Sequence, residues 1–230
     1  FQKMGFPFMK QLRMRPDYDT IIAELGIEDR QTFLDLPPDE DGKISRMEVT
    51  LSSRFLLALC REVIRHFTFS DKDVLDRENF AWIVQKELLE KYPELKRIPE
   101  EAEDRKDFTR ELYGYLERLC QRIWVLQISP RSESVPADHD TYLKLYQLQK
   151  PLLEEYDTIL LDEAQDANPC ILDILLNQRC QVIYVGDEYQ QIYAFRGTVN
   201  AMQKVKAKTL YLTQSFRFGN AIAKEANAIL

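Results

Sequence analysis

The sequence lacks the features of membrane-spanning, secreted and zinc-binding proteins. No apolar run approaches the ~18 residues of a membrane-spanning helix, and the N-terminal segment has no signal-peptide hydrophobic core. Only two histidines are present, and the four cysteines show no C-x-x-C spacing, which argues against a zinc site. We therefore expect reduced thiols, no membrane partner and an intracellular location, cytoplasmic in a prokaryote or nuclear in a eukaryote.

A net positive charge is also missing. The 230-residue chain has a formal net charge of −7 at pH 7, which is unusual for a protein that binds nucleic acid. Residues 181–230 nevertheless hold six basic side chains against three acidic ones. Because attraction of DNA depends on local charge, the acidic excess upstream does not exclude nucleic acid as a partner.

Two adjacent carboxylates follow a short apolar segment. Residues Tyr156–Leu161 are rich in branched apolar side chains and lead directly into Asp162 and Glu163. This pattern predicts a buried parallel strand that ends at the ligand-binding edge of a sheet. There Asp162 can hold the Mg²⁺ of a nucleotide, and Glu163 can orient the water that attacks the terminal phosphate. The alternative is a strand that simply ends in a polar turn.

A second apolar segment, Gln181–Val185, predicts another strand that ends at the same edge. Between the two strands, Asn168 is placed to cap a helix that has Pro169 in its first turn. Strand, helix and strand then form a βαβ unit, in which the two strands are parallel.

Polar and aromatic side chains follow the second strand. Gln190 can donate a hydrogen bond to a γ-phosphate or to the attacking water, and Arg196 can pair with phosphate. Tyr193 and Phe195 offer ring faces on which bases can stack. The alternative for both rings is burial as core aromatics beneath a loop.

Three motifs occur in fixed order in this half of the chain. They are Asp-Glu-Ala-Gln-Asp at 162–166, Gly-Asp-x-x-Gln-x-Ile-Tyr-x-Phe-Arg-Gly at 186–197 and Gln-Ser-Phe-Arg at 214–217. Together they resemble motifs II, III and IV of the UvrD/Rep-type superfamily-one DNA helicases, and the wording at 139–145 and 211–219 is most similar to the F-box DNA helicase branch. The resemblance covers about residues 136–230.

The resemblance implies ATP and Mg²⁺ as cofactors and a catalytic role for several residues. Asp162 is expected to coordinate Mg²⁺, and Glu163 to act as the catalytic base. Gln190 is expected to sense the γ-phosphate, and Arg217 to reach it from the second motor domain. Tyr193 is expected to stack on the adenine.

The resemblance also implies DNA as the substrate. Phe195 is expected to stack on a single-stranded base, and Arg196 to contact DNA. The implied reaction is ATP hydrolysis that drives 3′ to 5′ translocation and unwinding. The expected partners are single-stranded and forked DNA and the remaining helicase domains of the full-length protein.

One required motif is missing from the sequence. A nucleotide-binding Gly-x-x-x-x-Gly-Lys-Ser/Thr loop is not present. A Gly-Lys pair occurs at 42–43, but Ile44 follows it where Ser or Thr is required, and Pro37 occupies the position of the first glycine. We therefore expect an internal segment of a larger helicase, with little or no ATPase of its own. The alternative is a catalytically inactive, helicase-like module that binds nucleic acid or protein.

The residues before the motifs predict helices. Their apolar residues recur at helical spacing in 17–25, 47–67, 79–92 and 107–126. An acidic linker at 99–104 and a Ser/Pro-rich loop at 129–138 separate them, and Asp138 is placed to cap a further helix. A helical insertion of this kind is similar to subdomain 1B of the resembling family; a generic helical bundle is the alternative.

The expected fold class is α/β, with part of the parallel sheet of a P-loop NTPase (RecA-like) domain and a largely helical N-terminal insertion subdomain. We expect residues 1–151 to form the 1B-like helical subdomain. Residues 152–205 are expected to form the second half of RecA-like motor domain 1A, with motifs II and III. Residues 206–230 are expected to begin motor domain 2A, with motif IV.

A short acidic segment offers one competing motif. Residues 39–48 place Asp39, Asp41, Gly42 and Glu48 at the spacing of an EF-hand calcium loop, but Pro37 occupies its first ligand position. No helix of proper length is predicted before it. A solvated acidic turn at the start of the 47–67 helix is therefore the favoured interpretation.

Overall fold

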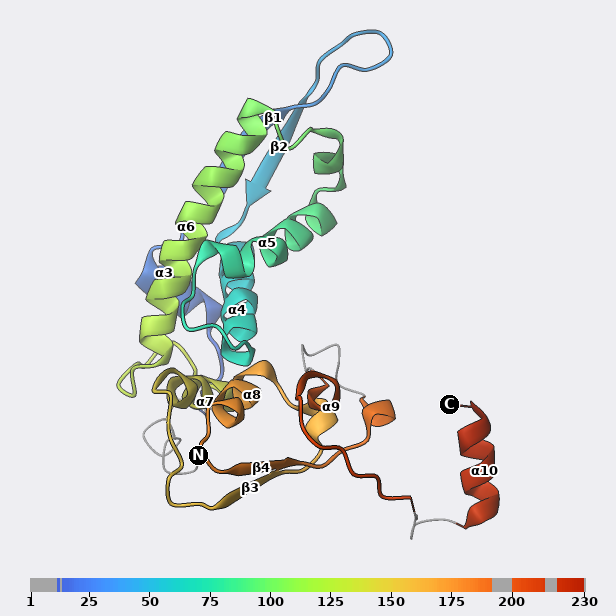
Figure 1. Cartoon of the computed structure of the whole chain (residues 1–230). Helices are drawn as coiled ribbons and strands as arrows, with labels where there is room; N and C mark the ends of the chain where they lie inside the picture. The colour runs from blue at the N-terminus through green and yellow to red at the C-terminus, as the bar shows by residue number, and fades with distance from the viewer. Residues whose placement is uncertain (1–11, 13, 192–199, 214–218, 230) are drawn as a thin grey trace.

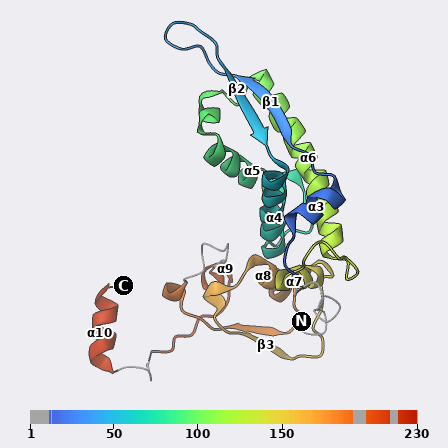
Figure 2. The ribbon, with the colours of Figure 1, turned by 180° about the vertical axis from the view of Figure 1, so that it is seen from behind.

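The chain is of mixed α/β class with two small sheets. The computed structural model describes residue 12 and residues 14–191, 200–213 and 219–229. A helical part that carries a β-hairpin occupies the upper half of Figure 1, and a smaller part built around a parallel strand pair lies below it. Figure 2 shows the same division from behind.

Four helices form the frame of the upper part: α3 (Tyr18–Leu25), α4 (Ser53–Phe69), α5 (Arg77–Lys91) and α6 (Glu103–Gln127). α3 begins at Asp17, whose side chain accepts a hydrogen bond from Asp19 N, and ends at Gly26, which has the left-handed φ of 60°. Three predicted helices are thereby confirmed, at 17–25, 79–92 and 107–126. α6 begins earlier than predicted, so the end of the acidic linker is helical.

The prediction of one continuous helix over 47–67 is wrong at its start. Residues Arg46–Leu51 form strand β2, which pairs antiparallel with β1 (Arg30–Asp35). Val49 and Leu51 are both buried, as alternation on one face of a strand requires. Helix α4 starts only after Ser52, whose Oγ accepts from Phe55 N at 3.3 Å.

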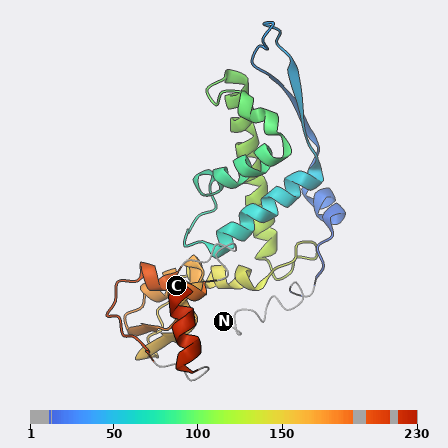
Figure 3. The same ribbon diagram turned by 90° about the vertical axis from the view of Figure 1, so that its right-hand side faces the viewer.

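The acidic segment at 39–48 lies at the tip of this hairpin. Asp39 Oδ1 accepts from Asp41 N at 3.1 Å and from Lys43 N at 2.8 Å, and Gly42 takes a φ of 73°. Among the described residues, no group of His, Cys, Asp or Glu side chains is arranged to hold a metal ion. The segment is thus an exposed acidic turn of a hairpin, and not the entrance of a helix. Figure 3 shows the hairpin projecting beyond the end of α6.

The main hydrophobic core lies in the upper part. It gathers residues from all four helices and from the inner face of the hairpin, and its fully buried side chains include Leu34, Leu51, Leu56, Leu57, Phe80 and Leu116. The short helix η2 (Pro93–Arg97) contributes Leu95 to the same core. None of the described helices combines the length and hydrophobicity that a bilayer crossing requires.

The lower part contains the predicted βαβ unit. β3 (Thr158–Leu161) and β4 (Gln181–Tyr184) are parallel, with Thr158 opposite Gln181 and Leu161 opposite Tyr184. α8 (Pro169–Leu176) connects them, and Asn168 Oδ1 accepts from Ile171 N at 2.8 Å. The predicted parallel strands and N-cap are confirmed.

The prediction of a buried strand at 156–161 is correct for only one face of the sheet. Leu161 and Tyr184 pack against Leu172 of α8 and Ala201 of α9 (Ala201–Lys204). On the opposite face, the exposed fractions of Leu160 and Ile183 are 63% and 40%. Within the described residues the sheet has two strands, and helices cover only one of its faces.

Helix α7 (His139–Leu148) joins the two parts. Asp138 and Thr141 form a capping box at its start, which confirms the predicted cap. α7 packs against α4 on one side and α8 on the other, and Leu143 shares a small core with Cys170 and Ile174. The last described helix, α10 (Asn220–Ile229), stands apart from these elements in Figures 1 and 2.

A polar cluster lies at the α7 junction. The buried Lys144 ammonium donates to the carbonyls of Ser70 and Lys72 and lies 4.4 Å from the centre of the Phe67 ring. Burial lowers the pKa of Lys144 to about 8. The residues that follow α4 are therefore attached to α7 by a desolvated cation.

Exposed ion pairs extend this attachment to α8. Lys150 Nζ lies 2.6 Å from Asp73 and 3.0 Å from Asp173, and the Gln147 side chain donates to both carboxylates. The segment after α4, the end of α7 and the middle of α8 are thus held in one network.

Candidate functional site

The carboxyl ends of β3 and β4 meet, as the sequence predicts. Val185 N donates to Leu161 O at 2.8 Å, and Ala164 N donates to Val185 O at 2.9 Å. These bonds carry the strand pairing past the ends of both strands. The segment with Asp162 and Glu163 therefore lies directly beside the segment that begins at Gly186.

Asp162 and Glu163 are exposed, and no Lys or Arg among the described residues forms an ion pair with either. Asp162 Oδ1 accepts from the Glu163 backbone N–H at 3.0 Å. One carboxylate, with waters and nucleotide phosphates, is a common environment for Mg²⁺. An unpaired Asp162 at a strand end fits that role, although no larger group of metal-binding side chains surrounds it among the described residues.

Glu163 has an unfavourable backbone conformation. Its φ of 52° and ψ of 41° lie in the left-handed region, which costs a residue with a Cβ roughly 1–2 kcal/mol. Its carbonyl accepts from Asp166 N at 3.0 Å at the start of the short helix η3 (Ala164–Asp166). Strain of this kind is concentrated at functional sites, and here it turns the chain sharply at the residue predicted to be the base.

Gln165 connects the two motif segments. Its side chain is buried; Nε2 donates to Glu163 Oε2 at 2.7 Å, and Oε1 accepts from Asp187 N at 3.1 Å. No role for Gln165 is predicted from the sequence, although it lies inside the first motif. The signal available was a neutral amide side chain two residues after a candidate base, but its partner across the strands is visible only in the structure.

Gly186 makes room for this connection. A Cβ at Gly186 would overlap with Gln165 Oε1 and would come within 3.1 Å of Ala164 N and 3.2 Å of Gln165 N. Any larger residue at Gly186 would therefore push the Gln165 amide out of place. The glycine is required here for close approach of two chain segments, and its φ is not in the left-handed range.

Gln190 lies on the short helix η4 (Glu188–Gln190) and is attached to the same segment. Its Nε2 donates to Asp187 Oδ2 at 2.8 Å, while Asp187 Oδ1 accepts from Tyr189 N at 3.0 Å. The structure thus brings three predicted site residues, Asp162, Glu163 and Gln190, to one edge of the sheet. The predicted residues Tyr193, Phe195, Arg196 and Arg217 lie outside the described residues, and their roles stay predictions.

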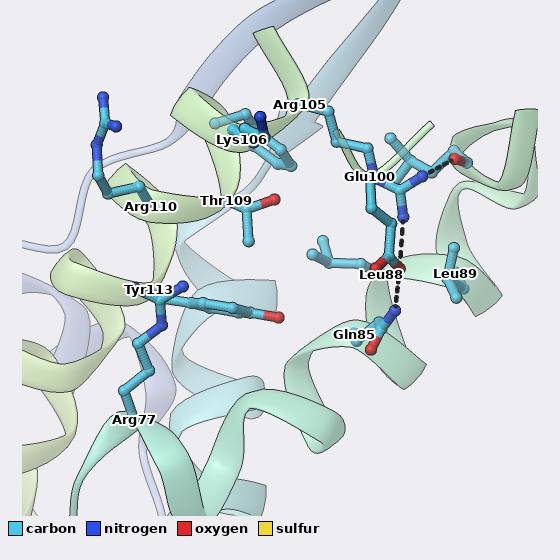
Figure 4. Close-up of a pocket in the computed structure, with 12 residues that line it drawn as sticks. Arg77, Gln85, Leu88, Leu89, Glu100, Arg105, Lys106, Thr109, Arg110 and Tyr113 are labelled. Atoms are coloured by element: carbon cyan, nitrogen blue, oxygen red, sulfur yellow. Dashed lines mark hydrogen bonds and ion pairs between the residues drawn. The ribbon is translucent and has the colours of Figure 1, made fainter. Parts of the chain in front are cut away.

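A cleft of about 440 Å³ lies away from this edge, between α5, η2 and α6. Figure 4 shows the basic side chains around it. Arg105 donates to the carbonyls of Leu95 and Ile98 and pairs with Glu100. Because these groups bond to one another, they hold α5, η2 and α6 together. The cleft is therefore part of the packing between helices and is separate from the candidate site.

Other charged groups at the cleft are occupied in the same way. Arg110 pairs with Asp107, and the Arg77 guanidinium lies 4.8 Å from the centre of the Tyr113 ring. Burial raises the pKa of the Tyr113 phenol, whose oxygen donates to Ala81 O at 3.2 Å. The cleft therefore offers mainly paired charges to a ligand.

Comparison with known families agrees with the geometry of the sheet edge. The family model of the UvrD/REP helicase N-terminal domain matches residues 26–209, which is most of the chain. The chain belongs to the UvrD/REP helicase family. The family match includes the segments that carry Asp162, Glu163, Gln165 and Gln190, and it also extends over the helical part.

Individual relatives of this UvrD/REP chain are DNA helicases by name. F-box DNA helicase 1 of Gallus gallus is 58% identical over 92 residues, which cover 40% of this chain and 9% of that protein. F-box DNA helicase protein 1 of Schizosaccharomyces pombe is 39% identical over 117 residues, which cover 48% of this chain and 13% of that protein. DNA helicase II of Escherichia coli is 27% identical over 130 residues, which cover 53% of this chain and 18% of that protein.

The matches are partial in length. The aligned part of this UvrD/REP chain corresponds to about a tenth of the two F-box helicases. No solved structure matches the chain.

Proposed function

We propose that this chain is part of an ATP-dependent DNA helicase that couples ATP hydrolysis to 3′ to 5′ movement on single-stranded DNA and to duplex unwinding. The observation that carries the proposal is the hydrogen-bonded path from Glu163 through Gln165 and Asp187 to Gln190. In a UvrD/REP chain, this path links the candidate base to the candidate phosphate sensor at the ligand edge of a parallel sheet.

The proposed fold is a P-loop NTPase (RecA-like) domain whose larger parallel sheet contains β3 and β4. The exposed apolar face with Leu160 and Ile183 supports this proposal, because an all-parallel sheet is covered on both faces in a complete domain. Residues 1–151 are assigned to a 1B-like subdomain, 152–205 to motor domain 1A and 206–230 to the start of motor domain 2A.

The proposed chemistry assigns one task to each residue at the sheet edge. Asp162 holds Mg²⁺, Glu163 takes the proton of the attacking water, and Gln190 responds to the γ-phosphate. Tyr193 stacks on the adenine, and Arg217 contacts the γ-phosphate. Bound ATP and Mg²⁺ supply the phosphoryl group and the charge that neutralises it.

The proposed substrates are single-stranded and forked DNA. Phe195 stacks on a base, and Arg196 pairs with a phosphate of the DNA backbone. The other proposed partners are the remaining helicase domains of the full-length protein. The proposed location is intracellular, in the compartment that holds the DNA.

A catalytically inactive module that binds nucleic acid or protein is the second candidate. The absence of a Gly-x-x-x-x-Gly-Lys-Ser/Thr loop from residues 1–230 favours it. The two candidates differ in whether the full-length protein supplies that loop and hydrolyses ATP.

The test of the proposed function is Glu163→Gln in the full-length protein. The variant keeps the shape of the side chain but loses the basic oxygen, so ATP turnover with single-stranded DNA should fall by about 10²–10⁴-fold while nucleotide and DNA binding remain. Steady-state phosphate release and equilibrium binding measure the two properties.

Glu154→Gln is the matched control, because Glu154 is an exposed carboxylate of the same part of the chain, 3.7 Å from Arg179. It should leave turnover unchanged. Turnover of Glu163→Gln within about tenfold of the parent would show that Glu163 is not the base.

A further inference from the structure

Gln165 is a buried side chain that touches both halves of the candidate site. Glu163 on one side and Asp187 on the other are both exposed, and the Gln165 amide spans the space between them. Each end of the amide bonds to a different segment. A buried amide of this kind can determine where the exposed carboxylate points.

The direction of the amide is fixed by its two partners. Its NH₂ group donates to the Glu163 carboxylate, and its oxygen accepts from the Asp187 backbone N–H. A reversed amide would place its oxygen against the carboxylate and its NH₂ against a second donor, which is unfavourable at both ends. The two bonds therefore lock the side chain in one orientation.

The neighbouring segment continues the connection. Asp187 also accepts from the Gln190 side chain at 2.8 Å, so a shift of Gln190 or of the 187–190 turn displaces the N–H that holds Gln165. The close approach at Gly186 leaves the Gln165 oxygen little freedom to move independently. Motion at Gln190 thus reaches Glu163 through two intermediate residues, Asp187 and Gln165.

We propose that Gln165 is a positioning residue that holds the Glu163 carboxylate in place and couples it to the position of Gln190. This inference rests on the proposed function, because it concerns the base of that reaction. When a nucleotide engages Gln190, the 187–190 turn moves, and the Gln165 amide carries the displacement to Glu163. Gln165 itself does not touch the reacting atoms.

Gln165→Glu separates positioning from simple packing. The variant has nearly the same shape and can still accept from Asp187 N, but it places an anion where an NH₂ group held the Glu163 carboxylate. Among the described side chains, charged groups at this edge include Asp162 and Asp166 on the same segment and Asp187 on the facing one. All three are acidic, so the added anion repels the Glu163 carboxylate and displaces it from its position.

The experiment measures ATP turnover by the full-length protein with saturating single-stranded DNA at pH 7. For Gln165→Glu, kcat should fall at least tenfold, while KM for ATP should stay within threefold. Loss of packing alone predicts a lower melting temperature without this separate effect on kcat.

Gln178→Glu is the matched control. Gln178 makes the same kind of bonds in the same part of the chain: its Oε1 accepts from Leu153 N, and its Nε2 donates to Pro151 O and Ile174 O. No carboxylate is among these partners. Its kcat and its KM for ATP should therefore match those of the parent, whatever its melting temperature.

A second variant tests the inference if Gln165→Glu does not fold. Gly186→Ala displaces the Gln165 amide without removing it, so its effect on kcat should largely overlap with that of Gln165→Ala. The double variant should then lose little more than the worse single variant. Losses that multiply would overturn the proposal, as would a kcat of Gln165→Glu equal to that of the parent. A parent protein without DNA-stimulated turnover would instead overturn the proposed function, and this inference with it.

Discussion

At the scale of single residues, Lys144 is a fully buried cation at the junction between α7 and the segment after α4. Its ammonium bonds to two carbonyls of the segment after α4 and lies against the Phe67 ring. A buried charge of this kind is stable only while its partners are present. Lys144 is therefore one of the side chains that link the helical part to α7.

We predict that Lys144→Met lowers the free energy of unfolding of the chain by about 2–3 kcal/mol at pH 7, because the carbonyls of Ser70 and Lys72 lose their charged donor. Urea denaturation followed by tryptophan fluorescence measures the change. Lys86→Met is the control, because Lys86 is exposed and its ion pair with Glu90 is a long one of 3.9 Å. The free energy of unfolding of this variant should stay within about 0.5 kcal/mol of the parent. Equal effects of the two substitutions would contradict the structural role of Lys144.

The same lysine predicts a pH dependence. Its pKa is about 8 in the folded chain against 10.5 for an unperturbed lysine, so between these values the unfolded chain holds a proton that the folded chain has released. Stability from this group therefore rises with pH across that window, by up to ~1.4 kcal/mol per pH unit. The stability difference between the parent and Lys144→Met should grow from pH 7.5 to 9.5; parallel curves would exclude this titration.

The residues of the candidate site differ in how far the sequence could predict them. Asp162, Glu163 and Gln190 follow strand ends and carry groups with obvious chemistry, so pattern and resemblance together locate them. Gln165 has a role only because Asp187 N lies 3.1 Å away, a distance set by strand register. A single sequence does not encode that register in any local pattern.

At the scale of elements, the strand β2 shows where sequence patterns fail. Leu51, Phe55 and Leu59 follow one another at a spacing of four, which favours a helix that includes residue 51. Residues Arg46–Leu51 instead pair with β1, and Ser52 starts the helix. The pairing partner lies in a different segment, so short apolar runs of this kind fit either structure from sequence alone. The βαβ unit was predictable because its caps and strand ends are local signals.

Two glycines on helices should respond in opposite directions to alanine. Gly26 ends α3 with a left-handed φ of 60°, so Gly26→Ala should cost about 1 kcal/mol of stability. Gly114 lies inside α6, and its new Cβ would meet only Arg118 Nη1 at 3.6 Å, so Gly114→Ala should add about 0.5–1 kcal/mol. Thermal unfolding of both variants checks the signs; a stabilising Gly26→Ala would show that the chain does not end α3 in this conformation.

At the scale of the whole molecule, the described sheet is half covered, and the sequence of residues 1–230 has no phosphate-binding loop. Residues positioned to hold Mg²⁺ and water cannot by themselves neutralise a triphosphate, which requires backbone amides and a lysine.

We predict that the purified 1–230 chain shows no ATP turnover above background, with or without single-stranded DNA. Phosphate release under steady-state conditions measures this, and 1–230 with Glu163→Gln provides the baseline. Turnover in the parent chain that Glu163→Gln abolishes would contradict the prediction, since it would mean that residues 1–230 bind and hydrolyse ATP without the loop.

Helix α6 connects the hairpin to α7 as one long, continuous element. At one end, Asp104 accepts from Asp35 N of the hairpin at 2.9 Å, and at the other, Gln127 donates to Thr141 of α7 at 2.7 Å. A 25-residue helix is about 38 Å long, so a tilt of about 5° at α7 swings its far end through about 3 Å. Since α7 also rests on α8, a rotation too small to break a hydrogen bond near the sheet becomes a visible displacement at the hairpin.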